Sequence, residues 1–453
     1  MKKQKQQSRM FWLLMWGLGL AGQLCWNMEN QWFNTFVYAK IAKDSNIVTL
    51  MVITSALVTT VSTFLFGTLS DRLGTRRRFV SIGYIVWGVF TILFGMTEYL
   101  AAGSVSDGTK LSVWVAVLVV LADDFMSFFG SMANDASFSA WTNDLTTDQN
   151  RGQVGAVLAV QPVIGTIVGT LLGGMLVGDN DNYSLLFWAM GLFVIAMGIV
   201  SLLFLKDAPN LRPHRQGTFF EQFSQVFKMR GFFANKELVL ACVTTAMFFI
   251  PFNIYFVHMG NWLIYRMGFT AGDMGLVQGI SLLLASVLAI PAAGVINRRK
   301  TPQLVLFAVA LNLAGLCVLS AFIRPGTVDT ASLFSVPNLP LFASVFLAGA
   351  GYVLMVQSST LWVKELYPEE SRGQFEGMRV MFFTLIPMMI GTVIGNEIIK
   401  NGAGTIVNDL GITENIPTED IYTWGARLVV LTLIPLIPAS KMYRRRVSAE
   451  VKA

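Results

Sequence analysis

The sequence predicts an all-α integral membrane protein that crosses the bilayer twelve times. Hydrophobic residues make up 54% of its 453 residues and charged residues only 13%, a balance that excludes an ordinary water-soluble domain. Apolar runs of about 18 residues or more recur along the whole chain, and each is long enough to cross ~30 Å of hydrocarbon. A repeated sequence pattern divides these runs into two sets of six.

Polar or basic turns separate the apolar runs. If the N-terminus is cytoplasmic, most Lys and Arg lie on the cytoplasmic side, so both termini are expected there. The net charge of +6 is then a topology signal and not a sign of nucleic-acid binding. The first run is far longer than a signal-peptide core, so no cleavable leader is expected. The expected spans are 10–41, 46–70, 79–98, 111–142, 153–177, 184–205, 237–266, 272–296, 302–323, 339–363, 374–399 and 421–440.

A gapless repeat links the two halves at a constant offset close to half the chain. It predicts parallel bundles at 1–205 and 237–453, joined by a cytoplasmic connector at 206–236. Phe219, Phe220 and neighbouring apolar residues indicate an amphipathic helix in this connector. The matching residues are Trp141, Asp144, Leu145, Asp148, Arg151, Gly152 and Gln153 with Trp362, Glu365, Leu366, Glu369, Arg372, Gly373 and Gln374.

The turn at 67–78, GTLSDRLGTRRR, is too charged to lie in hydrocarbon. Gly67 is expected to allow close helix approach, and Gly74 to adopt a positive φ. Asp71 is expected to accept hydrogen bonds from helix-end amides or to pair with an arginine. A second copy at 293–300 has Asn297 in place of the acid, so the cytoplasmic latch should be stronger in the first half. The predicted gating residues are Asp71, Arg72, Arg76, Asp144, Arg151, Glu365 and Arg372.

The first span carries a stripe of amides at helical spacing. Buried amides are tolerated in a bilayer when water or another helix satisfies them. The stripe therefore predicts either a water-filled cavity or an interhelical hydrogen-bond seam. Glu29 lies on nearly the opposite side of this helix and is expected to pair with a neighbouring helix or to form a separate proton site. The stripe contributes Asn27, Asn30, Gln31 and Asn34 to the predicted substrate site.

The fourth span gathers Asp123, Asp124, Ser131 and Asp135 on one polar face. Ionised carboxylates at this depth cost several kcal/mol unless they are paired, hydrated or protonated, so each is a functional candidate. Asp135 alternatively belongs to a structural network around the following loop. The cation-coupling candidates are Asp123, Asp124, Asp135 and Glu29.

The second half has no intramembrane acid before Glu397, so it is expected to supply mainly substrate contacts. Asn253 and Gln357 are the candidates there. Gln161, beside Pro162, is expected to face the cavity or to cap the kink that the proline makes. With Asp124 and Ser131 from the fourth span, these residues complete the predicted substrate site.

No phosphate-binding loop or nucleophile motif is present, so the sequence favours neither an enzyme nor an ATP-driven pump. Cys25, Cys242 and Cys317 lack paired spacing, and the two histidines are far apart, so no disulfide, metal or cofactor is expected. The expected partners are a small solute, a co-transported cation and the lipid bilayer. A monomer in the cytoplasmic membrane, without nucleic acid, is expected.

The 67–78 turn resembles the loop between the second and third helices of major facilitator superfamily transporters. The fourth-span acids and the stretch WVKELYPEESRGQFEG resemble the glycoside–pentoside–hexuronide cation symporters of that superfamily. The resemblance implies a sugar or glycoside carried with sodium or a proton, with Asp124 or Asp123 as the counterpart of that family's helix-four acid. Melibiose-type members usually carry cation-binding acids in the second span, but 46–66 has none, which favours a proton.

Two other functions remain open from the sequence. One is an exporter or facilitator of a different solute, such as an amphipathic drug or lysolipid, which would fit the many Met and Phe residues. The other is a non-transporting membrane receptor, although no signalling domain is recognisable in the short cytoplasmic segments.

Overall fold

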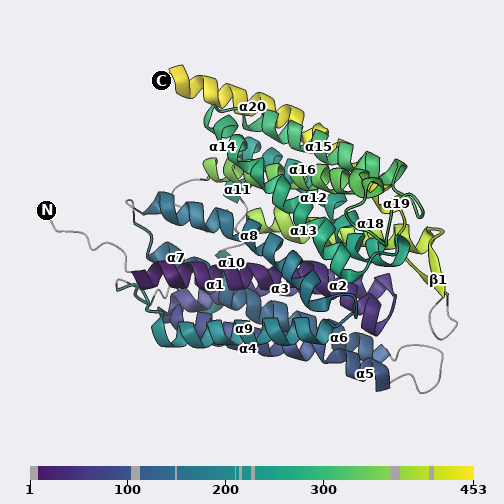
Figure 1. Cartoon of the computed structure of the whole chain (residues 1–453). Helices are drawn as coiled ribbons and strands as arrows, with labels where there is room; N and C mark the ends of the chain where they lie inside the picture. Colours follow the sequence, from purple (N-terminus) through teal and green to yellow (C-terminus); the bar gives the residue numbers. More distant parts are fainter. Residues whose placement is uncertain are drawn as a thin grey trace. The chain divides into compact units, whose positions relative to one another are not determined.

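A computed structural model describes residues 9–103, 113–147, 150–209, 211–213, 217–225, 230–367, 378–407 and 413–452. Nearly all of these residues are helical, and each expected span coincides with one helix or a run of consecutive helices, so the all-α prediction is confirmed (Figure 1). Within the described residues, ten helices are long and apolar enough to cross a membrane by themselves.

Two of the first six spans change helical pitch partway. The first span runs without a break from an α-helix into two wider π-helical turns, and the fourth span contains another. Such wide turns are frequent at functional sites. The elements are α1 (Arg9–Asn27), η1 (Met28–Trp32), α2 (Phe33–Phe36), η2 (Val37–Ile41), α3 (Ser45–Leu73), α4 (Arg77–Gly95), α5 (Thr97–Gly103), α6 (Val113–Gly130), η3 (Ser131–Phe138), α7 (Ser139–Asp144), α8 (Arg151–Val177) and α9 (Tyr183–Phe204).

The connector contains two short helices, α10 (Phe219–Gln225) and α11 (Arg230–Ala234). The last six spans follow, with a small antiparallel hairpin in the outer loop after α18, where Ile406 pairs with Glu414. The elements are α12 (Lys236–Asn261), η4 (Trp262–Arg266), α13 (Ala271–Val287), α14 (Ala289–Asn297), α15 (Thr301–Ala321), η5 (Val336–Asn338), α16 (Leu339–Glu365), η7 (Met381–Leu385), α18 (Ile386–Asn401), β1 (Thr405–Val407), β2 (Thr413–Asn415), α19 (Asp420–Val429), η8 (Val430–Thr432) and α20 (Leu433–Lys452).

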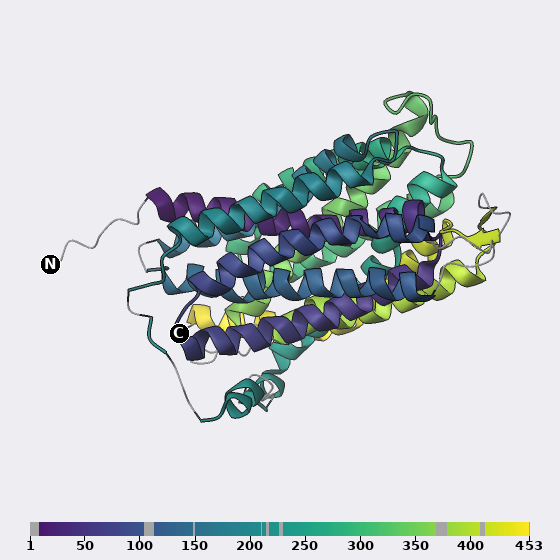
Figure 2. The same ribbon diagram turned by 90° about the horizontal axis from the view of Figure 1, so that it is seen from below.

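The chain forms two compact units. Unit 1 comprises Met1–Asn30, Leu57–Val177 and Asn182–Gln225, and unit 2 comprises Gln31–Ala56, Gly178–Asp181 and Val226–Ala453. The outer end of the first span and the start of α3 therefore belong to the same unit as the last six spans. The hairpin of unit 2 lies at the opposite end of that unit from the C-terminus (Figures 1 and 2).

Close helix contacts in unit 1 depend on glycine. A Cβ atom added at Gly165 would lie 2.4 Å from the Cβ of Gln23, and one at Gly169 would lie 2.5 Å from Oδ1 of Asn27. Both glycines thus let α8 approach α1, as small residues do in membrane helices. Gly67 differs, because a Cβ there would meet no described atom within 4 Å. The expectation that Gly67 permits close packing is therefore wrong, since it lies on a face of α3 where no described residue is near enough to pack.

We expect alanine at Gly88 and at Gly67 to have opposite effects on stability. A Cβ at Gly88 would lie 2.5 Å from the carbonyl oxygen of Gly191 on α9, so Gly88→Ala should cost about 1–3 kcal/mol of unfolding free energy. Gly67→Ala has free space inside a helix and should be neutral or stabilise by up to about 1 kcal/mol. Denaturant unfolding of both purified variants in detergent measures this, and equal effects would contradict it.

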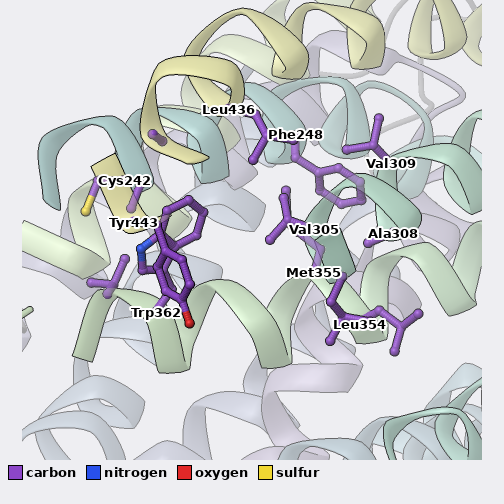
Figure 3. Close-up of a cluster of buried hydrophobic side chains, with 14 of the residues drawn as sticks. Cys242, Phe248, Val305, Ala308, Val309, Leu354, Met355, Trp362, Leu436 and Tyr443 are labelled. Carbon is purple, nitrogen blue, oxygen red and sulfur yellow. The ribbon is translucent and has the colours of Figure 1, made fainter. Parts of the chain in front are cut away.

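Unit 2 has a continuous apolar core, drawn in Figure 3. Phe248 of α12, Val305 and Val309 of α15, and Leu436 of α20 are buried in it. At one edge, the rings of Trp362 and Tyr443 meet edge to face with 5.5 Å between their centroids. This packing places the indole nitrogen of Trp362 beside the charged groups described below.

Candidate functional site

Three acidic side chains gather in the membrane-spanning part of unit 1. Asp123 of α6 is only 1% exposed and interacts electrostatically with Glu29 of η1 and with neighbouring Asp124. Ser127, one turn after Asp123, donates a hydrogen bond of 2.8 Å to Oε1 of Glu29. The expectation that Glu29 pairs with a neighbouring helix is therefore confirmed. Carboxylates that interact in a low-dielectric interior repel one another, so a bound proton or other cation would stabilise the cluster.

We define the acid cluster as Glu29, Asp123, Asp124 and Ser127, and Asp123 is the most enclosed of its three acids. Its Oδ1 atom has no hydrogen-bond partner among the described residues. Asp124 is the next residue of α6, but it is only partly buried. A buried acceptor without a partner is costly, and a proton bound to Asp123 would reduce this cost. The sequence favours Asp124 over Asp123 as the coupling acid, whereas in the structure Asp123 is the more buried of the two.

The other polar residues of the fourth span lie one to three turns further along. The hydroxyl of Ser131 is fully buried and has no hydrogen-bond partner in the described part of the chain. Asp135 accepts a hydrogen bond of 3.1 Å from Asn134, and Asn134 is also 3.1 Å from the hydroxyl of Tyr84. Tyr84 in turn donates to the carbonyl oxygen of Leu18. Asp135 therefore adjoins a network that joins η3 to α4 and α1.

Several stripe residues of the first span form the interhelical seam that the sequence left as an alternative. Asn27 donates to the hydroxyl of Thr170 on α8 at 3.2 Å. Within unit 2, Gln31 donates to the side chain of Gln278 at 2.7 Å, and Asn34 accepts from Asn261 at 3.2 Å through its backbone oxygen. At Asn27, Gln31 and Asn34, the stripe is therefore joined to α8, α13 and α12 respectively.

Three of the remaining predicted substrate residues donate hydrogen bonds to backbone carbonyl oxygens. Asn30 donates to the carbonyl oxygen of Trp26, and Asn253 donates to that of Phe249, each one turn back in its own helix. Gln161 donates to the carbonyl oxygen of Met15, which ties α8 to α1 rather than capping the Pro162 kink. Gln357 lies partly buried on α16.

The cytoplasmic latch of unit 1 centres on Arg76. Its guanidinium donates to Asp71 and, at 3.0 Å, to Oδ2 of Asp144. Burial acts to lower the pKa of Arg76, but Asp71 and Asp144 outweigh it, so the net pKa is raised and the group stays charged. Gly74 has φ +64°, as expected for this tight turn. Asp71 thus pairs with an arginine, one of the two roles predicted for it.

Two residues near this latch have roles that the sequence did not reveal. Asp207 accepts from the backbone nitrogens of Arg76 and Arg77, at 2.7 and 2.9 Å, and so caps the start of α4. Asp207 lies 131 residues after Arg76 in the chain, so no local sequence pattern indicates this role. Arg72 lies outside the latch itself and donates to Gly217 and Gln222, which attaches α10 to α3.

The latch of unit 2 centres on Arg446, which the repeat did not indicate. Glu365 pairs with Arg446 at 3.4 Å, and buried Glu237 pairs with the same arginine at 3.1 Å. Trp362 donates to Glu237 at 3.0 Å, whereas its repeat partner Trp141 donates to the carbonyl oxygen of Lys206.

Two predicted gating arginines fall outside the described side chains. Arg151 begins α8, but its side chain is not among those described, and Arg372 lies outside the described residues altogether.

Glu237 occupies the first turn of α12, where acids commonly stabilise the start of a helix. Its position in the sequence therefore indicates only this helix-capping role and not a role in the latch.

Comparison with known proteins agrees with this architecture. The sequence profile of the Major Facilitator Superfamily matches residues 15–392. The anhydromuropeptide permease of Escherichia coli (strain K12) is 25% identical over 213 residues, which span 47% of this chain and 41% of the permease. The chain therefore covers less than half the length of that relative.

Two solved structures illustrate the shared fold. A point mutant of the nucleoside transporter NupG superposes with a TM-score of 0.69 at 10% identity, over 94% of this chain and 99% of that one. A D-xylose–proton symporter gives 0.68 at 15% identity, over 94% and 97%. At such low identity these likenesses show the fold alone.

Proposed function

The chain belongs to the Major Facilitator Superfamily, and we propose that it is a proton-coupled symporter of a sugar or glycoside. The family and fold make it a multi-pass membrane transporter rather than an enzyme. The observation that carries the finer proposal is the acid cluster of Glu29, Asp123, Asp124 and Ser127 in unit 1. A transporter that moves only a neutral solute has no need for several carboxylates at this depth.

Proton coupling follows from the electrostatics of this cluster. When a proton occupies Asp123, one buried negative charge is removed and the repulsion between Asp123 and Glu29 falls. The solute would then bind to the hydrogen-bonding groups nearby, among which the buried hydroxyl of Ser131 has no partner within the described residues. Release of the proton on the cytoplasmic side restores the repulsion and favours return of the empty carrier.

The movement that links these steps would be rocking of the two six-helix bundles. The ion pairs of Arg76 with Asp71 and Asp144, three predicted gating residues, all lie within unit 1 and would hold its cytoplasmic end together during this movement. A proton is preferred to sodium because the start of α3, like the rest of residues 46–66, contains no acid. The combination of sugar and proton is also the activity named for one protein of the same fold, the D-xylose–proton symporter.

Transport in proteoliposomes tests this proposal. Purified protein is reconstituted with a trapped pH-sensitive dye, and the lumen is held about one pH unit more alkaline than the outside. A panel of monosaccharides, glycosides and anhydromuropeptides is then added, the last because a relative bears that name. We expect one of these carbohydrates to acidify the lumen and to accumulate inside.

Empty liposomes and liposomes with an added protonophore are the controls. Acidification that persists without protein would show a leak. If no carbohydrate drives proton entry, and a fluorescent lysolipid or amphipathic dye is transported instead, the sugar proposal is wrong and the alternative solute class is correct.

A further inference from the structure

Unit 1 has a surface cavity at its cytoplasmic end whose lining includes no residue of the acid cluster or of the Arg76 latch. It has a volume of about 450 Å³ and lies where the turn between α3 and α4 meets the end of α9. We propose that this cavity binds the phosphate group of a phospholipid from the inner leaflet. The proposal does not depend on which solute is carried. The cavity is lined by Leu73, Thr75, Arg77, Arg78, Leu202 and Asp207.

The lining combines positive charge with exposed apolar surface. Arg77 and Arg78 are both exposed, and their guanidinium groups are suited to hold a phosphate by paired hydrogen bonds. Leu73 and Leu202 are 47% and 43% exposed beside them. A free phosphate ion would gain nothing from these leucines, whereas a phospholipid has glycerol and acyl carbons next to its phosphate. The chemistry of the walls therefore favours a lipid over a soluble anion.

The position of the cavity along the helices agrees with a lipid head group. Arg77 and Arg78 begin α4, which runs from there into the membrane, and Leu202 lies in the last turn of α9. Both helices are membrane spans, so the cavity lies at the level where the head groups of the cytoplasmic leaflet are found. Anionic lipids are concentrated by basic residues at this level.

The carboxylate of Asp207 lies in the same cavity, and its contacts reduce but do not remove its repulsion of a phosphate. It accepts hydrogen bonds from Thr75 at 2.9 Å and from the backbone nitrogens at the start of α4. These donors and the positive end of the helix stabilise its charge. Arg77 also donates to the carbonyl oxygen of Leu202, which holds its side chain across the cavity. The phosphate would therefore be bound by guanidinium groups and not by the end of the helix.

Binding of phosphatidylglycerol to the full-length protein in a neutral detergent tests the proposal. The shift in unfolding temperature is titrated with this lipid, and phosphatidylcholine, glycerol 3-phosphate and inorganic phosphate are titrated in parallel. Removal of one basic residue near an anionic lipid weakens binding about 5-fold, so R78Q should lose about 5-fold and R77Q/R78Q about 30-fold. R77K/R78K keeps both charges but loses the paired hydrogen bonds, so it should bind more weakly than the unmodified protein and more tightly than R77Q/R78Q.

The matched control is R298Q/R299Q, which removes the same charge from the cytoplasmic turn between α14 and α15 in unit 2. We expect its affinity for phosphatidylglycerol to stay within about 2-fold of the unmodified protein. Equal losses in the two double variants would show diffuse attraction to the whole basic face and overturn the site. An equal shift with inorganic phosphate at the same concentration would overturn the lipid assignment. R78Q remains informative if R77Q/R78Q does not fold.

Discussion

Asp123→Asn is expected to abolish accumulation of solute against a gradient. Asparagine has nearly the same shape as aspartate, so the hydrogen bond between Ser127 and Glu29 should persist while the titratable group is lost. With one proton per solute, a gradient of one pH unit supports about tenfold accumulation, and the variant should fall to a ratio of about one. Uptake of labelled solute into proteoliposomes measures this ratio.

Solute exchange in the absence of a pH gradient is the accompanying readout, because it requires substrate binding but no net proton movement. We expect Asp123→Asn to retain it. Asp124→Asn is the matched comparison, and since Asp124 is less buried, that variant should keep a larger part of its accumulation. Unchanged accumulation in Asp123→Asn would remove Asp123 from the coupling site. Loss of exchange together with accumulation would instead make it a substrate-binding residue.

Glu237→Ala is expected to destabilise the protein by about 3 kcal/mol. The side chain of Glu237 is only 7% exposed and accepts hydrogen bonds from both Arg446 and the indole of Trp362. Removing it leaves a buried indole donor without a partner and an arginine without its main counter-charge. Denaturant unfolding in detergent, followed by tryptophan fluorescence, measures the change. Glu237→Gln should recover part of the loss because an amide oxygen can still accept from Trp362.

The control for this prediction is Glu365→Ala, because Glu365 contacts the same arginine. Its side chain is 44% exposed and its contact with Arg446 is longer, at 3.4 Å. Exposed ion pairs contribute at most about 1 kcal/mol, so this variant should lose little stability. Similar losses in the two alanine variants would show that burial of Glu237 is not what makes it important.

The fold could be predicted from the sequence because the bilayer leaves few alternatives. Unbroken apolar runs must be helices in hydrocarbon, and this constraint locates all twelve spans. Charged turns between them were equally informative, as the pairing of Asp71 and Asp144 with Arg76 shows. Gly67 shows the limit of this reasoning, because a glycine in a helix does not indicate which face has a neighbour.

The candidate site was less predictable, since it depends on how each helix is rotated about its own axis. Asp123 and Asp124 are adjacent on one helix, and only the packing of α6 shows that Asp123 is the buried one. Glu237 was missed for a related reason. Its importance comes from Arg446, more than two hundred residues later, and no local pattern connects the two.

The contacts that hold residues 31–56 to the rest of unit 2 include several between uncharged groups. Gln31 bonds to Gln278, and Ser45 donates to Asn396 at 2.6 Å, near the outer end of α18. Amides and hydroxyls do not titrate in the physiological range, and attraction between them is little affected by dissolved ions. These contacts, on the side that faces the environment, are therefore insulated from changes in acidity and salinity there. The ionic latches lie on the cytoplasmic side, and because Arg266 pairs with Glu419 on the outer side, only the uncharged contacts there are insulated in this way.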